Sequence, residues 1–190
     1  MRYKQRRLQK MDEEYLNHIK TLDQINLVIM GKDPFPVGAN GIPFCKETWK
    51  EQLNPTSSGF IVFYSLGLTQ RKLEIEFETP TRCFLYLATK GIVFLNLSYE
   101  LIGGKIIRDR HQKELREGFE INEQFLKKAA NIVLCGEANK NSWNGFKHAN
   151  INEVVHPAIR NGISPHKRIR EAWSDTWSCN SLNNRYNLYL

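Results

Sequence analysis

Four short apolar runs, separated by segments with helical spacing, constrain the fold of this chain more than any other feature. They are INLVIMG (25–31), GIVFLNL (91–97), NIVLCGE (131–137) and INEVVHP (151–157). The first three are almost continuously apolar, which is typical of strands covered on both faces of a parallel sheet. The fourth is more mixed. We therefore expect a mainly parallel, four-stranded central sheet.

Helical patterns lie between and after these runs. Residues 79–90 predict a helix that begins near Pro80, and residues 110–130 carry a broad apolar stripe. That stripe consists of Leu115, Phe119, Phe125, Leu126 and Ala129. Shorter helices are expected at 141–149 and at 164–173, the latter because Ser followed by Pro suits a helix start. The alternation predicts an α/β fold, a three-layer α/β/α sandwich around the sheet.

The chain length suits one domain, because 190 residues bury a full core. We assign residues 1–190 to that domain, with an N-terminal helical segment at 1–20 and a polar tail at 175–190 that the pattern does not place. Residues 56–78 fit the alternation less well. GFIVFYS (59–65) and KLEIEFE (72–78) have strand-like patterns. They predict a peripheral hairpin or edge strands.

Composition and cysteine spacing exclude several classes of protein. No apolar run approaches the ~18–20 residues of a membrane span, and the basic N-terminus lacks the apolar segment of a signal peptide. We therefore expect an intracellular protein without membrane contact. The cysteines form no CxxC motif, so no iron–sulfur cluster, structural zinc or other cofactor is expected. Cys83 and Cys135 lie in apolar runs and are predicted to be buried thiols.

Polar side chains follow the predicted strands at the point where each strand ends. Asp33 comes two residues after the first run, Asn96 lies near the end of the second, and Glu137 and His156 close the third and fourth. Each has a simpler explanation, such as an Asx-turn at the Asp–Pro dipeptide or a local backbone contact. Ligands of open α/β sheets bind at the carboxyl ends of strands. Together these residues predict a polar functional cleft at that edge.

Basic residues follow His156 and surround the start of the last predicted helix. The chain has 27 Lys and Arg against 20 Asp and Glu, for a net charge of +7. The local cluster consists of Arg160, His166, Lys167, Arg168 and Arg170. A helix N-terminus already offers free N–H groups to an anion, so the cluster predicts a phosphate site beside the cleft. A solvated basic helix face is the alternative explanation.

These motifs, in this order, resemble those of the uracil-DNA glycosylase superfamily. GKDPFPVGANGIPFCK (31–46) is similar to the water-activating motif of that family, and YLATKGIVFLNLSYEL (86–101) to the segment whose Asn reads the base. NIVLCGEANKNSWNGF (131–146) corresponds to the third strand with its loop, and VVHPAIRNG (154–162) resembles the His–Pro motif before the DNA-intercalating loop. The compact form of the first motif is more similar to that of the branch that includes the poxvirus enzymes.

The resemblance implies a monofunctional glycosylase that flips uracil out of DNA and hydrolyses its N-glycosidic bond. In this interpretation Asp33 orients or deprotonates the attacking water, and His156 donates to uracil O2. Phe44 stacks on the base and Asn96 pairs with its N3–H and O4. The backbone N–H groups of Lys32 and Asp33 contact O2, and the ring of Phe35 excludes the methyl group of thymine.

The resemblance also implies a DNA-binding surface. The loop of Ala158, Ile159 and Arg160 supplies the wedge that replaces the flipped base, with Ile159 and Arg160 both open as the wedge residue. The basic cluster described above adds Lys167 and Arg168 as expected contacts to DNA phosphate. The expected partner is uracil-containing DNA, single- or double-stranded, bound by a monomer, and no metal is implied.

Departures from the family pattern leave two other functions open. Lys32 stands in place of the usual Gln, Phe35 of Tyr, Pro36 of a frequent His, and Ala158 of a frequent Ser. The changes at Lys32 and Phe35 are compatible with a glycosylase for another modified pyrimidine. A DNA-binding or replication-assembly protein with secondary catalysis is the further alternative.

Overall fold

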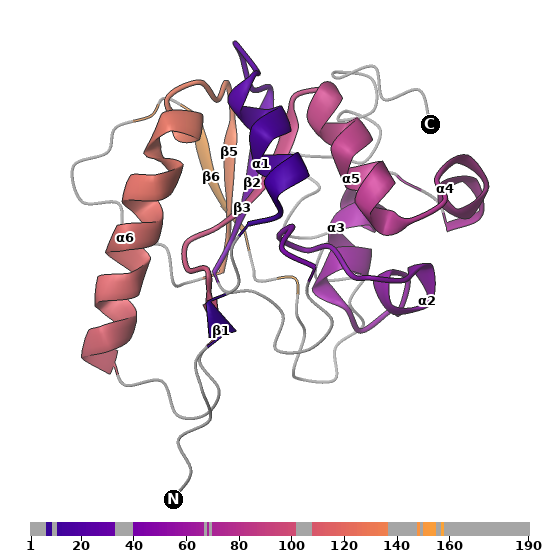
Figure 1. Ribbon diagram of the computed structural model, residues 1–190, viewed down its shortest axis with the longest axis horizontal. Coiled ribbons are helices and arrows are strands. Elements are labelled where there is room, and N and C mark those ends of the chain that lie inside the picture. Colours follow the sequence, from indigo (N-terminus) through magenta and orange to yellow (C-terminus); the bar gives the residue numbers. More distant parts are fainter. Residues whose placement is uncertain are drawn as a thin grey trace, which may run out of the picture.

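The computed structural model has an all-parallel, four-stranded sheet at its centre, as the apolar runs predict (Figure 1). It describes residues 7–8, 11–32, 40–66, 68, 70–101, 108–136, 148, 150–154 and 157. The strands are β2 (Leu27–Gly31), β3 (Ile92–Asn96), β5 (Ile132–Cys135) and β6 (Ile151–Val154). Their spatial order is β3-β2-β5-β6. The fold is therefore α/β, and the predicted runs coincide with its strands.

The burial of the strands explains their composition. Every residue of β2, β3 and β5 is buried, which accounts for three nearly continuous apolar sequences. In the edge strand β6 only Val154 is buried, in agreement with its mixed sequence. The register pairs Leu27 with Ile92 and Gly31 with Asn96, so β2 and β3 end side by side.

Helices lie on both sides of the sheet in the view of Figure 1, with α6 (Arg108–Leu126) to its left and α3 (Ser58–Ser65) and α5 (Pro80–Thr89) to its right. Helix α5 (Pro80–Thr89) begins as predicted, with Thr79 as N-cap and proline in the first turn. Helix α1 (Glu13–Lys20) begins at the N-cap Asp12, whose side chain accepts a hydrogen bond from the backbone of Tyr15 at 2.9 Å. Helix α6 confirms the helix predicted within 110–130.

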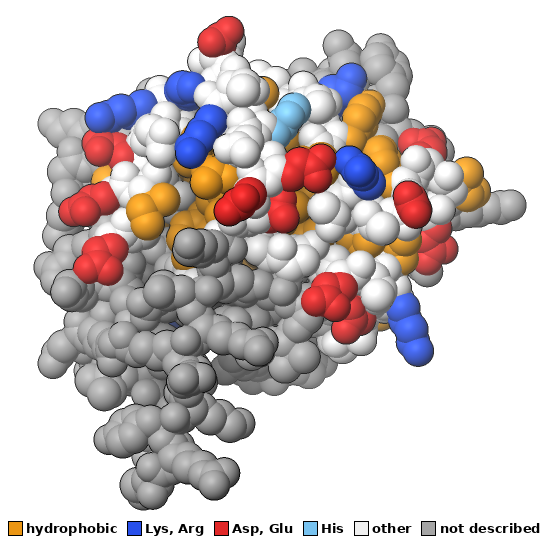
Figure 2. All heavy atoms as spheres, in the orientation of Figure 1, with side chains coloured by type: hydrophobic (Ala, Val, Ile, Leu, Met, Phe, Trp, Pro, Cys, Tyr) orange, Lys and Arg blue, Asp and Glu red, His pale blue; other side chains and the backbone are white. Residues whose placement is uncertain are grey.

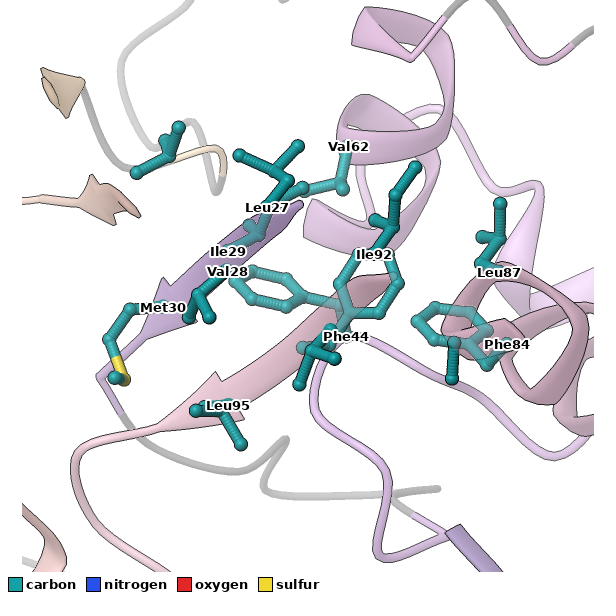
Figure 3. Packing of buried hydrophobic residues seen from close by; sticks show 14 of the residues in the cluster. Leu27, Val28, Ile29, Met30, Phe44, Val62, Phe84, Leu87, Ile92 and Leu95 are labelled. Atoms are coloured by element: carbon teal, nitrogen blue, oxygen red, sulfur yellow. The ribbon is translucent and has the colours of Figure 1, made fainter. Parts of the chain in front are cut away.

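The core on one face of the sheet is largely aromatic. In Figure 3, Val62 from α3 and Phe84 and Leu87 from α5 gather against β2 and β3. The Phe84 ring lies 4.6 Å from that of Phe94, between centroids. Phe94 in turn meets Phe44 edge-on at 6.3 Å. These contacts connect the loop after β2 to the helices through tilted rings, a favourable aromatic arrangement.

The strands expected within 56–78 are wrong, because this segment is helical. Helices α2 (Trp49–Gln52), α3 (Ser58–Ser65) and α4 (Gln70–Glu76) occupy the region before α5. Helix α3 is apolar nearly throughout because it is packed into the core, and a short run of that kind has no period that distinguishes helix from strand.

The alternating pattern of α4 has a different explanation. Leu73 and Phe77 are four residues apart, so in a helix they share one face, and the Phe77 N–H donates to the Leu73 carbonyl at 3.0 Å. Leu73 is buried, whereas Ile75 between them is 76 % exposed. Ile75, which makes the sequence look like an alternating strand, therefore lies on the surface.

The remaining expectations concern short elements and the surface. A two-stranded antiparallel pair joins β1 (Arg7–Leu8) to β4 (Glu100–Leu101). Cys83 and Cys135 are buried, as predicted. The helices expected at 141–149 and 164–173, and the tail at 175–190, lie outside the described residues. No helix in the described part of the chain is long and apolar enough to cross a membrane. Acidic and basic side chains are interspersed over the described part of the face in Figure 2.

Candidate functional site

The carboxyl ends of all four strands lie at one edge of the sheet, because the strands are parallel. Neighbouring strands are about 4.8 Å apart, so the ends of β2 and β6 are separated by roughly 10 Å. Asp33 follows the end of β2 by two residues, and His156 follows the end of β6 by two residues. The topology therefore places Asn96 at the same edge as the ends of β2 and β6, the strands that precede Asp33 and His156 in the sequence.

Gly31, Asn96 and Phe44 come together at the ends of β2 and β3. A Cβ atom built on Gly31 would lie 2.5 Å from Asn96 Oδ1 and 2.9 Å from Phe44 Cζ. Both side chains therefore occupy the space above Gly31, where only glycine leaves room for them. Of the predicted base-binding residues, the structure places Phe44 and Asn96 side by side, and Lys32 directly follows Gly31.

Asn96 is a buried polar residue, only 4 % exposed. Its Oδ1 lies against Gly31, and among the described residues no side-chain hydrogen bond joins it to a partner. The backbone of Asn96 is fully satisfied by contrast. Its N–H donates to the Tyr99 hydroxyl at 3.3 Å, and its carbonyl accepts from Asn122 Nδ2 at 2.7 Å. Asn96 thus has a backbone held on both sides at the strand end.

Phe44 has an unusual backbone conformation with φ of +66°. A left-handed φ at a bulky residue costs ~1–3 kcal/mol and persists only where the surroundings impose it. The buried Gln52 imposes it here, because its Nε2 donates to the Phe44 carbonyl at 3.2 Å and its Oε1 accepts from Lys46 N at 2.8 Å. Gly59 packs against the same carbonyl so closely that a Cβ there would overlap it. The ring is consequently held beside Asn96 at 6 % exposure.

The cysteines near this site are not activated nucleophiles. Burial raises the pKa of the Cys45 thiol to about 12, and Asn40 Nδ2 lies 3.0 Å from its sulfur. Burial likewise raises the pKa of Cys135 to about 12. Reactive cysteines have lowered pKa values and partial exposure. Within the described ranges, no group of His, Cys, Asp and Glu is arranged to hold a metal ion.

Several predicted site residues lie outside the described residues. These are the catalytic candidates Asp33 and His156, the pocket residue Phe35, and the DNA-binding candidates Ala158, Ile159, Arg160, Lys167 and Arg168. Their assignment stays a prediction.

Sequence reasoning missed the buried polar residues that hold the site. Gln52 and Asn122 are each completely buried. Asn122 carries a signal in the sequence, because it lies on the apolar stripe of α6 that includes Phe125 and Leu126. A polar residue on such a stripe indicates a specific buried partner. Gln52 has no comparable signal.

Comparison of the sequence with models of protein families and with curated proteins finds no match.

Proposed function

We propose that this protein is a DNA glycosylase that hydrolyses the N-glycosidic bond of uracil in DNA and leaves an abasic site. One observation carries the proposal. The side chain of Asn96, a residue only 4 % exposed, lies together with the ring of Phe44 over Gly31, and Phe44 is held in a left-handed conformation. Asn96 ends β3 at the carboxyl edge of the parallel sheet, beside Gly31 at the end of β2, and β2 is the strand that precedes Asp33 in the sequence.

The two described side chains suit recognition of a flipped pyrimidine. A base extruded from the stack exposes a π face and a Watson–Crick edge, and glycosylases bind both. Phe44 offers the stacking surface. The Asn96 carboxamide offers one donor and one acceptor, which match O4 and N3–H of uracil. Cytosine presents the opposite pattern, so a carboxamide held in one orientation rejects it.

The chemistry is assigned to residues next to this pair. Cleavage of the C1′–N1 bond develops positive charge on the sugar and negative charge on the departing base. Asp33 stabilises the sugar cation and orients the attacking water, and His156 donates a hydrogen bond to uracil O2. This assignment is supported by the positions of the two residues in the chain, each two residues beyond the end of a parallel strand.

The proposal is tested with purified protein and oligonucleotides that contain one uracil, single-stranded and paired with A or G. We expect uracil release, with abasic sites that are cleaved by hot alkali. Asp33→Asn should lower the single-turnover rate by at least ~10²-fold while DNA binding persists. Asp23→Asn is the matched control, because Asp23 is an exposed carboxylate in another loop, and its rate should not change.

Two results would replace the proposal by its alternatives. Weak release of uracil beside strong release of another modified pyrimidine would assign the same site to that base. Salt-dependent DNA binding without release of any base would identify a DNA-binding protein. Equal rates for the wild type and Asp33→Asn would refute the proposed chemistry.

A further inference from the structure

The edge strand β3 has backbone groups that face away from its partner β2, and two of its residues have these groups bound by side chains. At Phe94, the Tyr15 hydroxyl accepts from the backbone N–H at 2.7 Å and donates to the carbonyl at 3.3 Å. At Asn96, the same two kinds of group are held by two residues, Tyr99 and Asn122. The two positions are chemically alike, but only the second carries a carboxamide side chain.

The contacts around Asn96 form a closed set in which every donor has an acceptor. The Asn96 N–H donates to the Tyr99 hydroxyl, and that hydroxyl donates to Asn122 Oδ1 at 3.1 Å. Asn122 then returns a hydrogen bond from Nδ2 to the Asn96 carbonyl at 2.7 Å. Burial raises the pKa of Tyr99 above its usual value, so the hydroxyl keeps the proton that it donates. The ring of contacts surrounds the backbone of one residue.

Helix α6 reaches β3 closely because of Gly118. A Cβ at Gly118 would overlap the carbonyl of Leu97, the residue after Asn96. Gly118 and Asn122 are one helical turn apart and share a face of α6. The contact at Gly118 therefore brings the Asn122 amide within reach of the strand. Phe125 and Leu126, on the same side of the helix, are buried and fix its position.

We propose that Tyr99 and Asn122 are positioning residues that set the direction of the Asn96 carboxamide for base recognition, an inference that rests on the proposed function. The Cα–Cβ bond of a strand residue is fixed by the rotation of its two flanking peptide groups. Tyr99 holds one of these groups and Asn122 the other. Since Asn96 Oδ1 already lies against Gly31 and Phe44, rotation of the backbone would turn the amide away from the base edge.

A matched control distinguishes a positioning role of Tyr99 from an ordinary contribution to stability. Tyr99→Phe removes one hydroxyl from the contacts at Asn96. Tyr15→Phe removes one hydroxyl from the contacts at Phe94, two residues earlier in the same strand. Both variants should shift the urea midpoint to lower concentration. Only Tyr99→Phe should lower the single-turnover rate of uracil release, by about 10- to 100-fold for a displacement approaching 1 Å.

The decisive measurement is made in an Asn96→Ala background. There Tyr99→Phe should have no further effect on the rate, because its target side chain is already gone. Asn122→Leu, which keeps the branched shape but not the amide, should behave in the same way. Where Asn122→Leu does not fold, Tyr99→Phe alone decides. An equal loss from Tyr99→Phe in both backgrounds, or an equal loss from Tyr15→Phe, overturns the inference.

Failure of the proposed function is detected separately. If the wild type releases no base, the glycosylase proposal is wrong. The side-chain amide resonances of Asn96 then test the positioning role without any substrate. They should shift in Tyr99→Phe and stay in place in Tyr15→Phe, and unchanged resonances in Tyr99→Phe would overturn the inference whatever the activity.

Discussion

Substitution of Gly31 by alanine is the sharpest test of the geometry at the strand ends. The added Cβ would lie 2.5 Å from Asn96 Oδ1 and 2.9 Å from Phe44 Cζ. An ordinary contact is about 3.4 Å or longer, so the Asn96 oxygen has to move by roughly 1 Å. Gly31 has no positive φ, so the backbone itself accepts alanine. The whole effect of the substitution therefore falls on the two neighbouring side chains.

The expected magnitudes differ for stability and for activity. Overpacking costs about 1–3 kcal/mol, offset by up to ~1 kcal/mol because alanine restricts the unfolded chain. The protein should therefore remain folded, with a modest shift in urea denaturation. A misplacement of about 1 Å at a recognition group can lower a rate by 10²-fold. We expect a loss of about that size in single-turnover release of uracil.

Gly91→Ala provides the control for a glycine lost from the same sheet. Gly91 precedes β3 at the opposite end, has φ of +73°, and a Cβ there would lie 2.9 Å from Asn26 Nδ2. This variant should lose at least as much stability as Gly31→Ala while the folded protein retains its rate. If Gly31→Ala is folded and stays within threefold of the wild type, the Asn96–Phe44 pair does not determine recognition.

Three further predictions concern the fold. Leu73→Ala should destabilise the protein by about 2–5 kcal/mol and Ile75→Ala by no more than ~0.5 kcal/mol in urea denaturation; the reverse order would contradict the helical assignment of α4. The free energy of unfolding should fall as pH rises above about 10. Burial raises the pKa of Tyr15, so the folded protein keeps a proton that the unfolded chain loses. Urea midpoints from about pH 8 to about pH 11 measure this decline, which Tyr15→Phe should flatten. Cys45 and Cys135 should react with a thiol reagent only as the protein unfolds, and a burst of labelling at either site in the native protein would contradict their burial.

The sheet was predictable because its strands are buried on both faces. The apolar runs that contain Val28, Val93 and Val133 are too short and too uniformly apolar to suit anything but buried strands. The parallel pairing of these strands follows from the helical segments that connect them. The helices α3 and α4 were not predictable in the same way. Phe63 is apolar in a run without a period, and Ile75 is apolar without being buried, so pattern and packing disagree there.

The candidate site was predictable only in part. Asn96 stands out as a polar residue at the end of an apolar strand, and Phe44 follows a turn rich in glycine and proline. The residues that hold them are recognisable only in three dimensions. Gln52 lies eight positions after Phe44 and Asn122 lies 26 positions after Asn96. Such contacts depend on how the helices approach the strands, which no local pattern encodes.

The hydroxyl of Tyr15 has a consequence for association between molecules. β3 is an edge strand, and an uncovered edge offers unpaired N–H and C=O groups to a strand of another chain. Tyr15 of α1 is fully buried, and its hydroxyl binds both the N–H and the carbonyl of Phe94. A strand of another molecule therefore finds no free backbone group at Phe94. Helix α1 therefore blocks intermolecular β-pairing at this position. A chain that loses α1 exposes the backbone groups at the centre of β3, where a strand of another molecule can pair and start aggregation.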